Sequence, residues 1–389
     1  MPQPSISLAP SLAQVMPSRI RELANISFTM DDVLKLHFGE STMPTPRYIV
    51  DAAVQAIHDG HTFYSENAGI PPLRAAIADK VAELHRVELA PTDVLVTASG
   101  VQALNVAIRC VIDPGDAAIV LSPNWPNGTE IVRLIGATPT EIPLVAVGDR
   151  FEIDFAALEA ALTPRTRLLI YTSPSNPLGW VATVAEQRAL LDLCRRHNLW
   201  LLADEVYERI YYGGVVAPSI LRLCTRDDAV IVTQSFSKSY CMTGWRLGWV
   251  VARADLVAKA GQLNEFIVSH APTMIQRAGI VALQQGEDDL HAMVEQLQER
   301  QAFCADALAE MPRVSLPKAE GAFYLFPRID GVKDSFAFAV DLLKTKKVSV
   351  APGVAFGNGG EGSIRICYAP DMSVLEPAME RLRDYLARG

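Results

Sequence analysis

The sequence predicts an α/β protein with a mainly parallel sheet and, in its last hundred residues, a smaller α+β part. Short, nearly continuous apolar runs recur between residues 93 and 252, and segments of helical period separate them. The last hundred residues change to one long helical pattern followed by shorter strands. Continuous apolar runs are typical of strands buried on both faces. Strand–helix alternation favours a parallel sheet covered by helices.

The expected strands and helices alternate along the middle of the chain. The strand runs are DVLVTAS (93–99), AAIVLSP (117–123), RLLIYTSP (167–174), LWLLADE (199–205), AVIVTQS (229–235) and RLGWVVA (246–252). Helical patterns such as VQALNVAIRCVI and VAEQRALLDLCRRHN lie between them.

The C-terminal part begins with the helical pattern DDLHAMVEQLQERQAFCADALAEM and continues with the shorter runs GAFYLFP, KVSVAPG and SIRICYA. We therefore expect a large α/β domain over residues 46–285. Residues 1–45 and 286–389 would form a small α+β domain with an N-terminal arm.

Composition excludes several function classes. The 389 residues carry a net charge of −9 and no long Lys/Arg run, which disfavours nucleic acid and anionic membranes as partners. The six cysteines form no CxxC pair and no zinc-like spacing with histidine, so no metal site is expected. The start of the chain does not resemble a signal peptide, and no apolar stretch approaches 18 residues. We expect a cytoplasmic protein.

Polar residues follow five of the predicted strands. Ligands of open α/β sheets bind beyond the carboxyl ends of the strands, and five such ends at one edge indicate a site. The residues in question are Gly100, the segment Asn124-Trp125-Pro126-Asn127, the segment Ser175-Asn176-Pro177-Leu178-Gly179, the segment Asp204-Glu205-Val206-Tyr207, and the segment Ser235-Phe236-Ser237-Lys238.

Several of these residues suit a phosphate. Gly100 and Val101 open a helix, and the free N–H groups of a helix N-terminus bind anions. Ser235 and Ser237 add hydroxyl donors, and Arg246 adds a bidentate cation. Neither a GxGxxG motif nor a P-loop is present, which disfavours dinucleotides and nucleoside triphosphates. Taken alone, Ser99-Gly100 is better explained as an ordinary helix start.

Asp204 and Lys238 are charged residues at the ends of buried strands, a position where a charge needs a specific partner or role. A carboxylate at that depth is costly without a cation or several donors, although a helix N-cap is the common alternative. A poorly solvated lysine near an arginine can have a lowered pKa and act as a Schiff-base nucleophile, whereas most loop lysines are simply solvated. The flanking Ser-x-Ser and Gly-Trp-Arg favour the nucleophile.

These residues resemble the class I/II aminotransferases, which are fold type I enzymes that use pyridoxal 5′-phosphate (PLP). The resemblance covers essentially the whole chain. Its motifs are S-x-S-K followed by G-x-R-x-G at 235–248, Ser-Gly-Val-Gln-Ala-Leu, the 123–127 segment, Ser-Asn-Pro-Leu-Gly at 175–179, Asp-Glu-Val-Tyr at 204–207, Gly-Ala-Phe-Tyr at 321–324 and Ser-Ile-Arg-Ile at 363–366. It implies a mainly parallel seven-stranded sheet in the large domain.

The resemblance also implies roles for the site residues. Lys238 would form the cofactor aldimine and move the substrate proton, and Asp204 would pair with the cofactor's ring nitrogen. Asn176 and Tyr207 would bond the ring hydroxyl, and Trp125 would stack on the ring or, alternatively, serve as a core aromatic. The resemblance implies phosphate binding by Gly100, Val101, Ser235, Ser237 and Arg246. It implies substrate binding by Arg365 together with Gly39, Trp125 and Asn176. Tyr64 would contact the phosphate bound by the neighbouring subunit.

The Tyr64 role implies a homodimer with active sites at its interface, although Tyr64 could simply pack under the following helix. For His270 in the same region, a packing role is the simpler interpretation.

Three positions depart from the family pattern. Leu178 stands where threonine is usual, and Cys241 stands where Gly, Ala or Ser is commoner. Some aspartate-specific relatives carry a lysine where this chain has Val101, and valine cannot contact a side-chain carboxylate. The resemblance therefore implies a ping-pong aminotransferase that moves an amino group from an L-amino acid, neutral or aromatic rather than aspartate, to a 2-oxo acid.

Two alternatives compete with this interpretation. A PLP-dependent carbon–sulfur β-lyase would need the same lysine, aspartate and arginine. A ligand-sensing module joined to a DNA-binding domain would need an N-terminal extension, for which about 40 residues are too few.

Overall fold

The computed structural model describes residues 17–387, and its centre is a seven-stranded mixed sheet. The strand order is β2-β10-β9-β8-β7-β3-β4, with β10 antiparallel to both neighbours and every other pair parallel. The strands are β2 (Val94–Thr97), β3 (Ala117–Ser122), β4 (Thr138–Pro143), β7 (Thr166–Thr172), β8 (Trp200–Asp204), β9 (Val230–Ser235) and β10 (Gly248–Ala252). The predicted fold class is confirmed.

Six of these strands match the predicted apolar runs, and β4 does not. Its sequence TPTEIP contains two prolines, which lack the N–H that a central strand must donate. The strand lies at the end of the sheet and pairs only with β3. An edge position tolerates prolines, which explains why β4 carries no continuous apolar signal.

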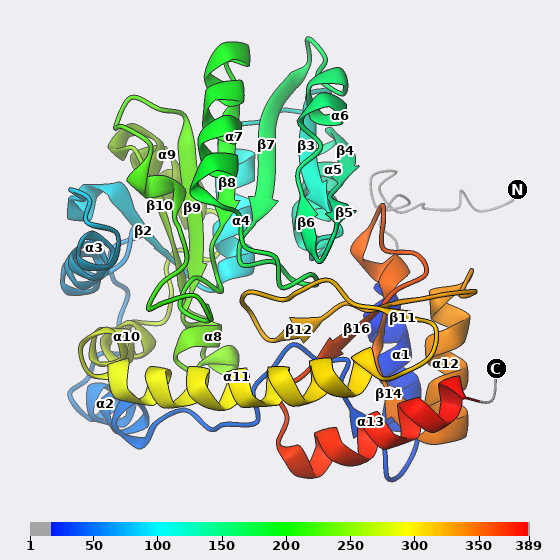
Figure 1. Ribbon diagram of the computed structural model, residues 1–389. Helices are drawn as coiled ribbons and strands as arrows, with labels where there is room; N and C mark the ends of the chain where they lie inside the picture. The colour runs from blue at the N-terminus through cyan, green and yellow to red at the C-terminus, as the bar shows by residue number, and fades with distance from the viewer. Residues whose placement is uncertain (1–16, 388–389) are drawn as a thin grey trace, which may run out of the picture.

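Helices cover both faces of the sheet, so alternate strand residues enter two separate cores. Ile119 and Leu121 pack on one side with α3 (Pro71–His85), α7 (Val184–His197) and α10 (Thr273–Gln285). Val120 packs on the other side with α4 (Gly100–Arg109), α5 (Asn127–Ile135) and α9 (Ala254–Glu265). Figure 1 shows α7 in front of the sheet and α4 behind it.

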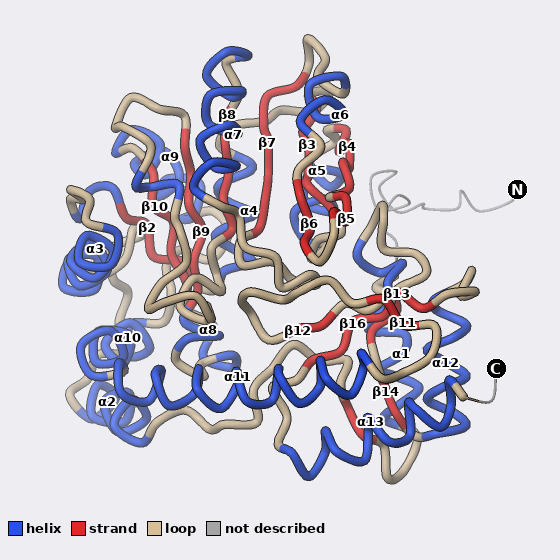
Figure 2. The backbone as a smooth tube through the Cα atoms, in the orientation of Figure 1, coloured by secondary structure: helices blue, strands red, loops and turns tan. Residues whose placement is uncertain are grey.

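A second group of elements lies below the sheet, along the long helix α11 (Glu287–Ala309) (Figures 1 and 2). Its core is formed by Leu23, Leu36 and apolar residues between 290 and 386, joined by Tyr207 and Ile210 from the segment after β8. It contains α1 (Arg19–Phe28), β1 (Leu34–Lys35), β11 (Val314–Ser315), β12 (Tyr324–Leu325), β13 (Arg328–Ile329), α12 (Ser335–Lys346), β14 (Val348–Ser349), β15 (Ala351–Pro352), β16 (Ile364–Cys367) and α13 (Met372–Leu386). Two domains divided near residues 46 and 286 remain our proposal.

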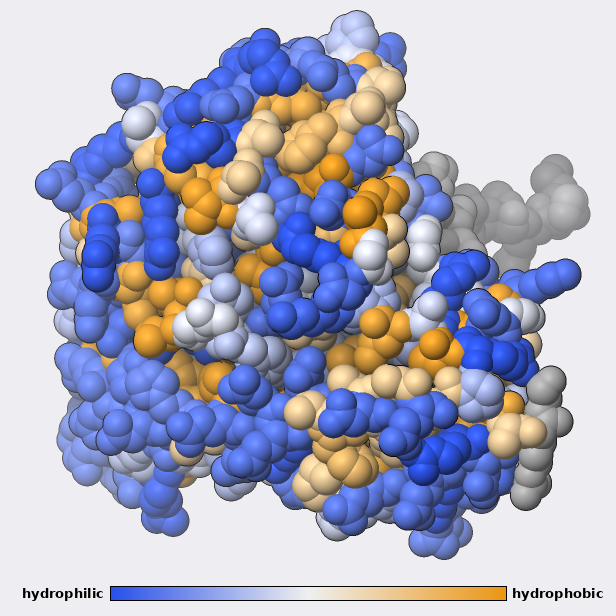
Figure 3. Space-filling view, viewed as in Figure 1, coloured by the Kyte–Doolittle hydropathy of each residue, from blue (hydrophilic) through white to orange (hydrophobic). Residues whose placement is uncertain are grey.

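The remaining regular elements connect these two groups or lie at their edges. They are α2 (Arg47–His58), β5 (Val145–Val147), β6 (Arg150–Glu152), α6 (Phe155–Ala160) and α8 (Phe236–Ser239). Figure 3 shows a largely hydrophilic surface over α2 and the start of α11, with separate hydrophobic groups above it. Within residues 17–387, no helix combines the length and apolar character that crossing a bilayer requires. The prediction about a signal peptide concerns the first residues, which lie outside that range.

Candidate active site

A pocket of about 260 Å³ lies at the carboxyl edge of the sheet. The strand register explains its position, because Asp204 at the end of β8 pairs with Thr172 of β7 and Thr233 of β9. The polar strand ends therefore meet in space, as the sequence predicts. The pocket is lined by Gly39, Gly100, Val101, Leu104, Trp125, Thr172, Asn176, Asp204, Val206, Tyr207, Ser235, Ser237, Lys238, Thr243, Arg246, Tyr324 and Arg365.

Asp204 lacks a cationic partner in the described structure. Its carboxylate accepts a bond of 3.4 Å from the Thr233 hydroxyl and another from the Val206 N–H. Burial raises the pKa of Asp204 to about 6, which the two hydrogen bonds only partly oppose. A protonated ring nitrogen placed against this carboxylate would supply the missing positive charge.

Lys238 lies in the single-turn helix α8, directly after β9. Its Nζ donates to the Gly39 carbonyl oxygen and lies 5.8 Å from the centre of the Tyr207 ring. Burial lowers the pKa of Lys238 to about 8, and Arg365 and Arg246 add to that effect. A lysine with this pKa is substantially neutral slightly above neutral pH, as a nucleophile or base requires.

Residues from α4, from the end of β9 and from the segment between β9 and β10 form a cup that suits a phosphate. The first-turn N–H groups of Gly100 and Val101 have no intrahelical acceptor, and the Ser235 and Ser237 hydroxyls lie 2.9 Å apart. A Cβ on Gly248 would lie 2.6 Å from the Gly100 backbone nitrogen, so only glycine permits this approach. Arg246 forms no ion pair within residues 17–387.

Arg365 occupies the opposite end of the pocket and is 1% exposed. One terminal nitrogen donates to Asn176 Oδ1 at 2.9 Å and the other to the His37 carbonyl. The guanidinium carbon lies 4.5 Å from the Tyr324 ring centre and 4.9 Å from the Phe356 ring centre. Its Nε is buried and has no hydrogen-bond partner in the described part of the chain. This end therefore offers a fixed, incompletely used cation for a carboxylate.

The contacts of Arg365 also orient Asn176 and connect to a pair of tyrosines. Because Asn176 Oδ1 accepts from Arg365, its amide NH₂ is the group left to donate to a ligand. The Tyr207 hydroxyl lies 2.6 Å from the Tyr324 hydroxyl, and both rings line the pocket. Burial raises the pKa of each tyrosine, so both phenols stay protonated at neutral pH.

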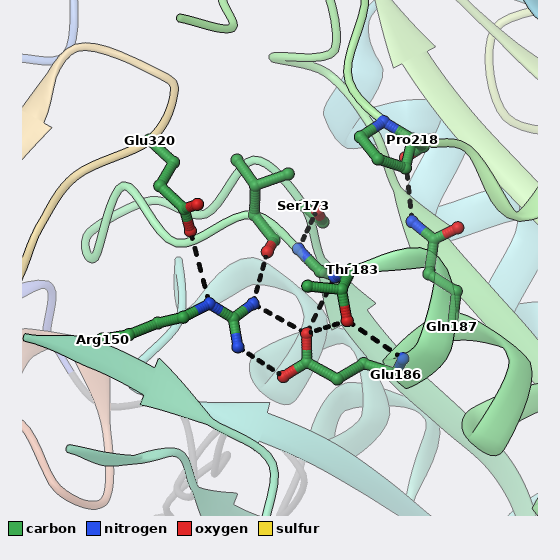
Figure 4. Close-up of polar contacts among 9 residues, drawn as sticks. Arg150, Ser173, Thr183, Glu186, Gln187, Pro218 and Glu320 are labelled. Carbon is green, nitrogen blue, oxygen red and sulfur yellow. Dashed lines mark hydrogen bonds and ion pairs between the residues drawn. The ribbon is translucent and has the colours of Figure 1, made fainter. Parts of the chain in front are cut away.

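The loop that carries Asn176 is held by Arg150 (Figure 4). Arg150 bonds both carboxylate oxygens of Glu186, at 3.2 and 2.8 Å, and the Val181 carbonyl at 3.0 Å. Its Nε lies 3.6 Å from a carboxylate oxygen of Glu320, on the segment that leads to β12. Glu186 also caps α7 through Thr183, so one arginine fixes a helix start and two loops.

All but one of the predicted site residues line this one pocket. The exception is Tyr64, which is 91% exposed on the surface of the chain, although this does not contradict a contact with a second subunit. Five further residues were missed: Leu104, Thr172, Val206, Thr243 and Tyr324. Leu104 lies one helical turn after Gly100, so helical geometry would have found it. Val206 lies between the predicted residues Asp204 and Tyr207, in the turn that follows β8. Thr172 ends a predicted strand.

Two departures from the family pattern have different structural consequences. Leu178 is buried in the main core, so a leucine is accommodated there by packing. Cys241 adopts a left-handed backbone with φ of 51°, a conformation that favours glycine. Its thiol lies 3.6 Å from the sulfur of Met293.

A second buried titratable cluster, formed by His85, Glu205 and Glu208, was not predicted. His85 Nε2 lies 2.8 Å from a Glu208 carboxylate oxygen, and Arg222 donates to His85 Nδ1 at 3.4 Å. The bond from Arg222 places the imidazole proton on Nε2, which donates to Glu208. Burial raises the pKa of the neighbouring Glu205 to about 7. Both imidazole nitrogens are in use, so this cluster fits a structural role.

The site combines an unpaired buried carboxylate, a lysine of lowered pKa and an anion cup around one pocket. On this fold, that combination defines a PLP enzyme of fold type I, and the residues present fit the cofactor. The chain belongs to the family "Aminotransferase class I and II", whose model matches residues 31–382. It is therefore a PLP-dependent aminotransferase, as the sequence predicts.

Known relatives agree with this assignment. An aspartate aminotransferase of Geobacillus stearothermophilus is 32% identical over 387 residues, covering 98% of this chain and 97% of the relative. Aromatic-amino-acid aminotransferase 2 of Thermococcus litoralis is 34% identical over 385 residues, covering 98% of each. The solved aspartate aminotransferase of Thermotoga maritima superposes with a TM-score of 0.91 at 30% identity, covering 98% of this chain and 100% of that one.

Proposed function

We propose that the amino donor is a neutral or aromatic L-amino acid rather than aspartate. The observation that carries this proposal is the set of charges around the pocket. Its charged lining residues within 17–387 are Asp204, Lys238, Arg246 and Arg365. Each has a role toward the cofactor or the substrate α-carboxylate, which leaves no cation for a second carboxylate. Val101 is 44% exposed at this wall and is apolar.

The neighbouring cavity supports the same conclusion. It measures about 730 Å³ and shares Ser237, Lys238, Thr243 and Arg246 with the first pocket. Its further lining includes Glu40, Met43 and Phe323 but no additional cation. A carboxylate beside Glu40 would meet repulsion, whereas an apolar or aromatic side chain would find apolar surface.

The residues divide the work of transamination between them. When bound, PLP supplies an aldehyde that takes up the amino group and a ring that accepts electrons released at Cα. Lys238 would hold the cofactor covalently and, once the substrate amine has released it, would take up the proton that leaves substrate Cα. Asp204 keeps a proton on the ring nitrogen, and Arg365 grips the α-carboxylate. A 2-oxo acid reverses these steps in a ping-pong cycle.

A donor panel tests the proposal. Single-turnover absorbance changes with phenylalanine, leucine, alanine and aspartate give kcat/KM for the donor half-reaction. We expect at least about a tenfold preference for a neutral or aromatic donor over aspartate, the size of a missing charge-assisted bond. A large preference for aspartate over every neutral donor would overturn the proposal. Catalytic release of a thiol, ammonia and pyruvate from an added S-alkyl-L-cysteine, without a 2-oxo acid acceptor, would instead indicate the β-lyase.

A pair of variants sharpens the panel. Val101→Lys places a cation at the apolar wall and should raise kcat/KM for aspartate relative to phenylalanine. Val101→Met has a similar reach without the charge and should leave that ratio unchanged. Equal responses of the two variants would show that this wall does not face the substrate side chain.

We further propose a cytoplasmic homodimer that completes each active site. Phe63, Tyr64 and Phe266 are 81%, 91% and 86% exposed, which is unusual for large apolar side chains. Their segments lie together, because the Thr273 hydroxyl donates to the Phe63 carbonyl and the Tyr64 ring meets the His270 ring edge-on at 5.7 Å. His270 thus packs against Tyr64, as its simpler interpretation predicts.

Mixed dimers test the proposal that Tyr64 serves the partner's site. Tyr64→Ala should lower PLP affinity, and Lys238→Ala should be inactive. Mixing the two chains under exchange conditions should restore activity, because one site of each hybrid would hold an intact Lys238 and receive an intact Tyr64. Light scattering reports the oligomeric state. A monomer, or a mixture no more active than its parts, would contradict the proposal.

A further inference from the structure

Tyr324 links the two ends of the site, although it has no assigned role. It lies in β12, is fully buried, and pairs in register with Cys367 of β16, two residues beyond Arg365. Its hydroxyl meets Tyr207, while its ring faces the guanidinium of Arg365. One side chain therefore contacts both the candidate partner of the cofactor's ring oxygen and the candidate anchor of the substrate.

The hydroxyl of Tyr324 is held in place from two sides. It lies 2.6 Å from the Tyr207 oxygen on one side. On the other, a Cβ on Gly39 would lie 2.1 Å from it, so the backbone of Gly39 forms a wall directly against the phenol. The absence of a side chain at residue 39 is what allows the phenol to reach Tyr207.

The direction of the Tyr207–Tyr324 bond follows from proton counting. Each protonated phenol has one proton to donate. If Tyr207 donates to the ring oxygen of the cofactor, its own oxygen can accept only the proton of Tyr324. A hydroxyl that accepts a hydrogen bond becomes a stronger donor, because the two bonds polarise one another.

The ring of Tyr324 has a separate task. The guanidinium carbon of Arg365 lies over this ring, 4.5 Å from its centre, and over the Phe356 ring, 4.9 Å from that centre. Aromatic faces attract a cation and prevent it from tilting. The guanidinium plane is thereby fixed in the orientation that a substrate carboxylate must match.

We propose that Tyr324 is a positioning residue with two separable functions: its hydroxyl strengthens Tyr207 as a donor to the cofactor, and its ring orients Arg365 toward the substrate carboxylate. This inference rests on the proposed function for the roles of Tyr207 and Arg365. It does not depend on which amino acid is the donor.

Two substitutions separate the functions. Tyr324→Phe keeps the ring and removes the hydroxyl, and Tyr324→Leu removes both. The first readout is the pH titration of the holoenzyme's visible absorbance, which reports the proton next to the ring oxygen. The second is the Kd of 3-phenylpropanoate, an unreactive monocarboxylate, measured on the holoenzyme by absorbance or fluorescence.

We expect Tyr324→Phe to raise the apparent pKa of the absorbance change by about half a unit to one unit, while the Kd stays within about twofold. Tyr324→Leu should give the same spectral shift and weaken the probe by about tenfold. Tyr212→Phe is the matched control, since Tyr212 also pairs hydroxyls with a buried tyrosine, Tyr368, at 2.8 Å but does not line the pocket. It should change neither readout.

Three outcomes would overturn the proposal: a wild-type spectral pKa in Tyr324→Phe, an unchanged Kd in Tyr324→Leu, or a shift in Tyr212→Phe equal to that in Tyr324→Phe. Circular dichroism and PLP content establish that each variant is folded and loaded. Both readouts need only bound PLP and no turnover. A failed donor panel with the expected Tyr324 results would therefore refute the donor assignment alone.

Discussion

The two ends of the active-site pocket are built in opposite ways. The phosphate cup takes Ser235, Ser237 and Arg246 from one short stretch, and Arg246 is exposed. The carboxylate end takes Arg365 from β16, Asn176 from the loop after β7, and His37 from the segment after β1. All three residues there are buried. One end takes its side chains from one short stretch, adds the backbone start of α4 and carries an exposed arginine, whereas the other is assembled from distant segments and closed.

We infer that the exposed end mainly contributes affinity for an anion, whereas the buried end fixes the orientation of the bound carboxylate. An exposed cation attracts an anion without a fixed geometry, since water screens it and its side chain is free to adapt. A buried guanidinium with two fixed acceptors and two flanking rings accepts a carboxylate in one orientation. We therefore expect substitutions at the closed end to affect turnover more severely than those in the cup. Substitutions at the residue between the two ends, and then at each end, test this ranking.

The largest effect should follow Lys238→Ala, because Lys238 lies between the two ends. The variant should lose covalent attachment of PLP and at least about a thousandfold in transamination rate. Borohydride reduction followed by mass spectrometry checks the attachment. The control is Lys259→Ala, which removes an exposed lysine of α9 that donates a hydrogen bond to Gln262 and does not line the pocket. Retained turnover in Lys238→Ala would refute the central assignment.

The second prediction compares the two arginines with one substitution. Arg365→Lys keeps the charge but loses the fork, so we expect kcat/KM to fall roughly 100- to 1000-fold with little change in PLP affinity. Arg246→Lys should weaken PLP by about tenfold and leave the KM of the amino acid nearly unchanged when PLP saturates. Equal effects of the two variants on KM would remove the distinction between a closed and an open end.

The third prediction concerns the pH dependence of stability at the closed end. His37 is fully buried, neither ring nitrogen has a partner within residues 17–387, and burial beside Arg365 lowers its pKa from 6.5 to about 4. Between these pH values the unfolded chain binds a proton that the folded chain refuses. The contribution of neutral His37 to the free energy of unfolding is therefore fully present above pH 6.5. It is lost as the pH falls from 6.5 toward 4, by roughly 2–3 kcal/mol.

His37→Leu removes this linkage. The difference in unfolding free energy between the variant and the wild-type protein should move in favour of the variant by that amount from pH 7 to pH 4. Urea unfolding at several pH values measures it. Because the carboxylates are the same in both proteins, their titration cancels in the difference. A difference that does not vary with pH would show that His37 binds its proton as readily in the folded protein as in the unfolded chain.

The smallest effect concerns the strained backbone next to the cup. A left-handed residue other than glycine costs about 1–2 kcal/mol, and Cys241 has φ of 51°. Cys241→Gly should therefore be about 1 kcal/mol more stable than Cys241→Ala, since both lose the thiol but only glycine relieves the backbone. Thermal unfolding of the two variants gives the comparison. An alanine variant at least as stable as the glycine variant would mean that this turn is not strained.

The local end of the site is also the end that sequence predicts best. Strand ends followed by Ser-x-Ser-Lys, and a helix opening on Gly100, indicate an anion site from residue order alone. Pairing of Arg365 with Asn176 and His37 depends on contacts between segments up to 328 positions apart, which periodicity does not encode. Tyr324 stands out in the sequence only as part of a motif, because a buried aromatic strand residue looks the same whether it packs a core or lines a pocket. Strand β4 was not predicted because, as an edge strand with two prolines, it lacks the continuous apolar run that marks the buried strands.

The single reversed strand of the sheet, β10, closes the segment that carries most of the cup's side chains. Because β10 runs back alongside β9, Gly248 comes to lie opposite Ser235, and the chain between them closes on itself. Residues 235–248 therefore form a closed loop whose two ends are paired with each other in the sheet. The side chains that Ser235, Ser237 and Arg246 contribute to the cup are fixed relative to one another by this pairing, without help from the C-terminal group of elements that supplies Arg365.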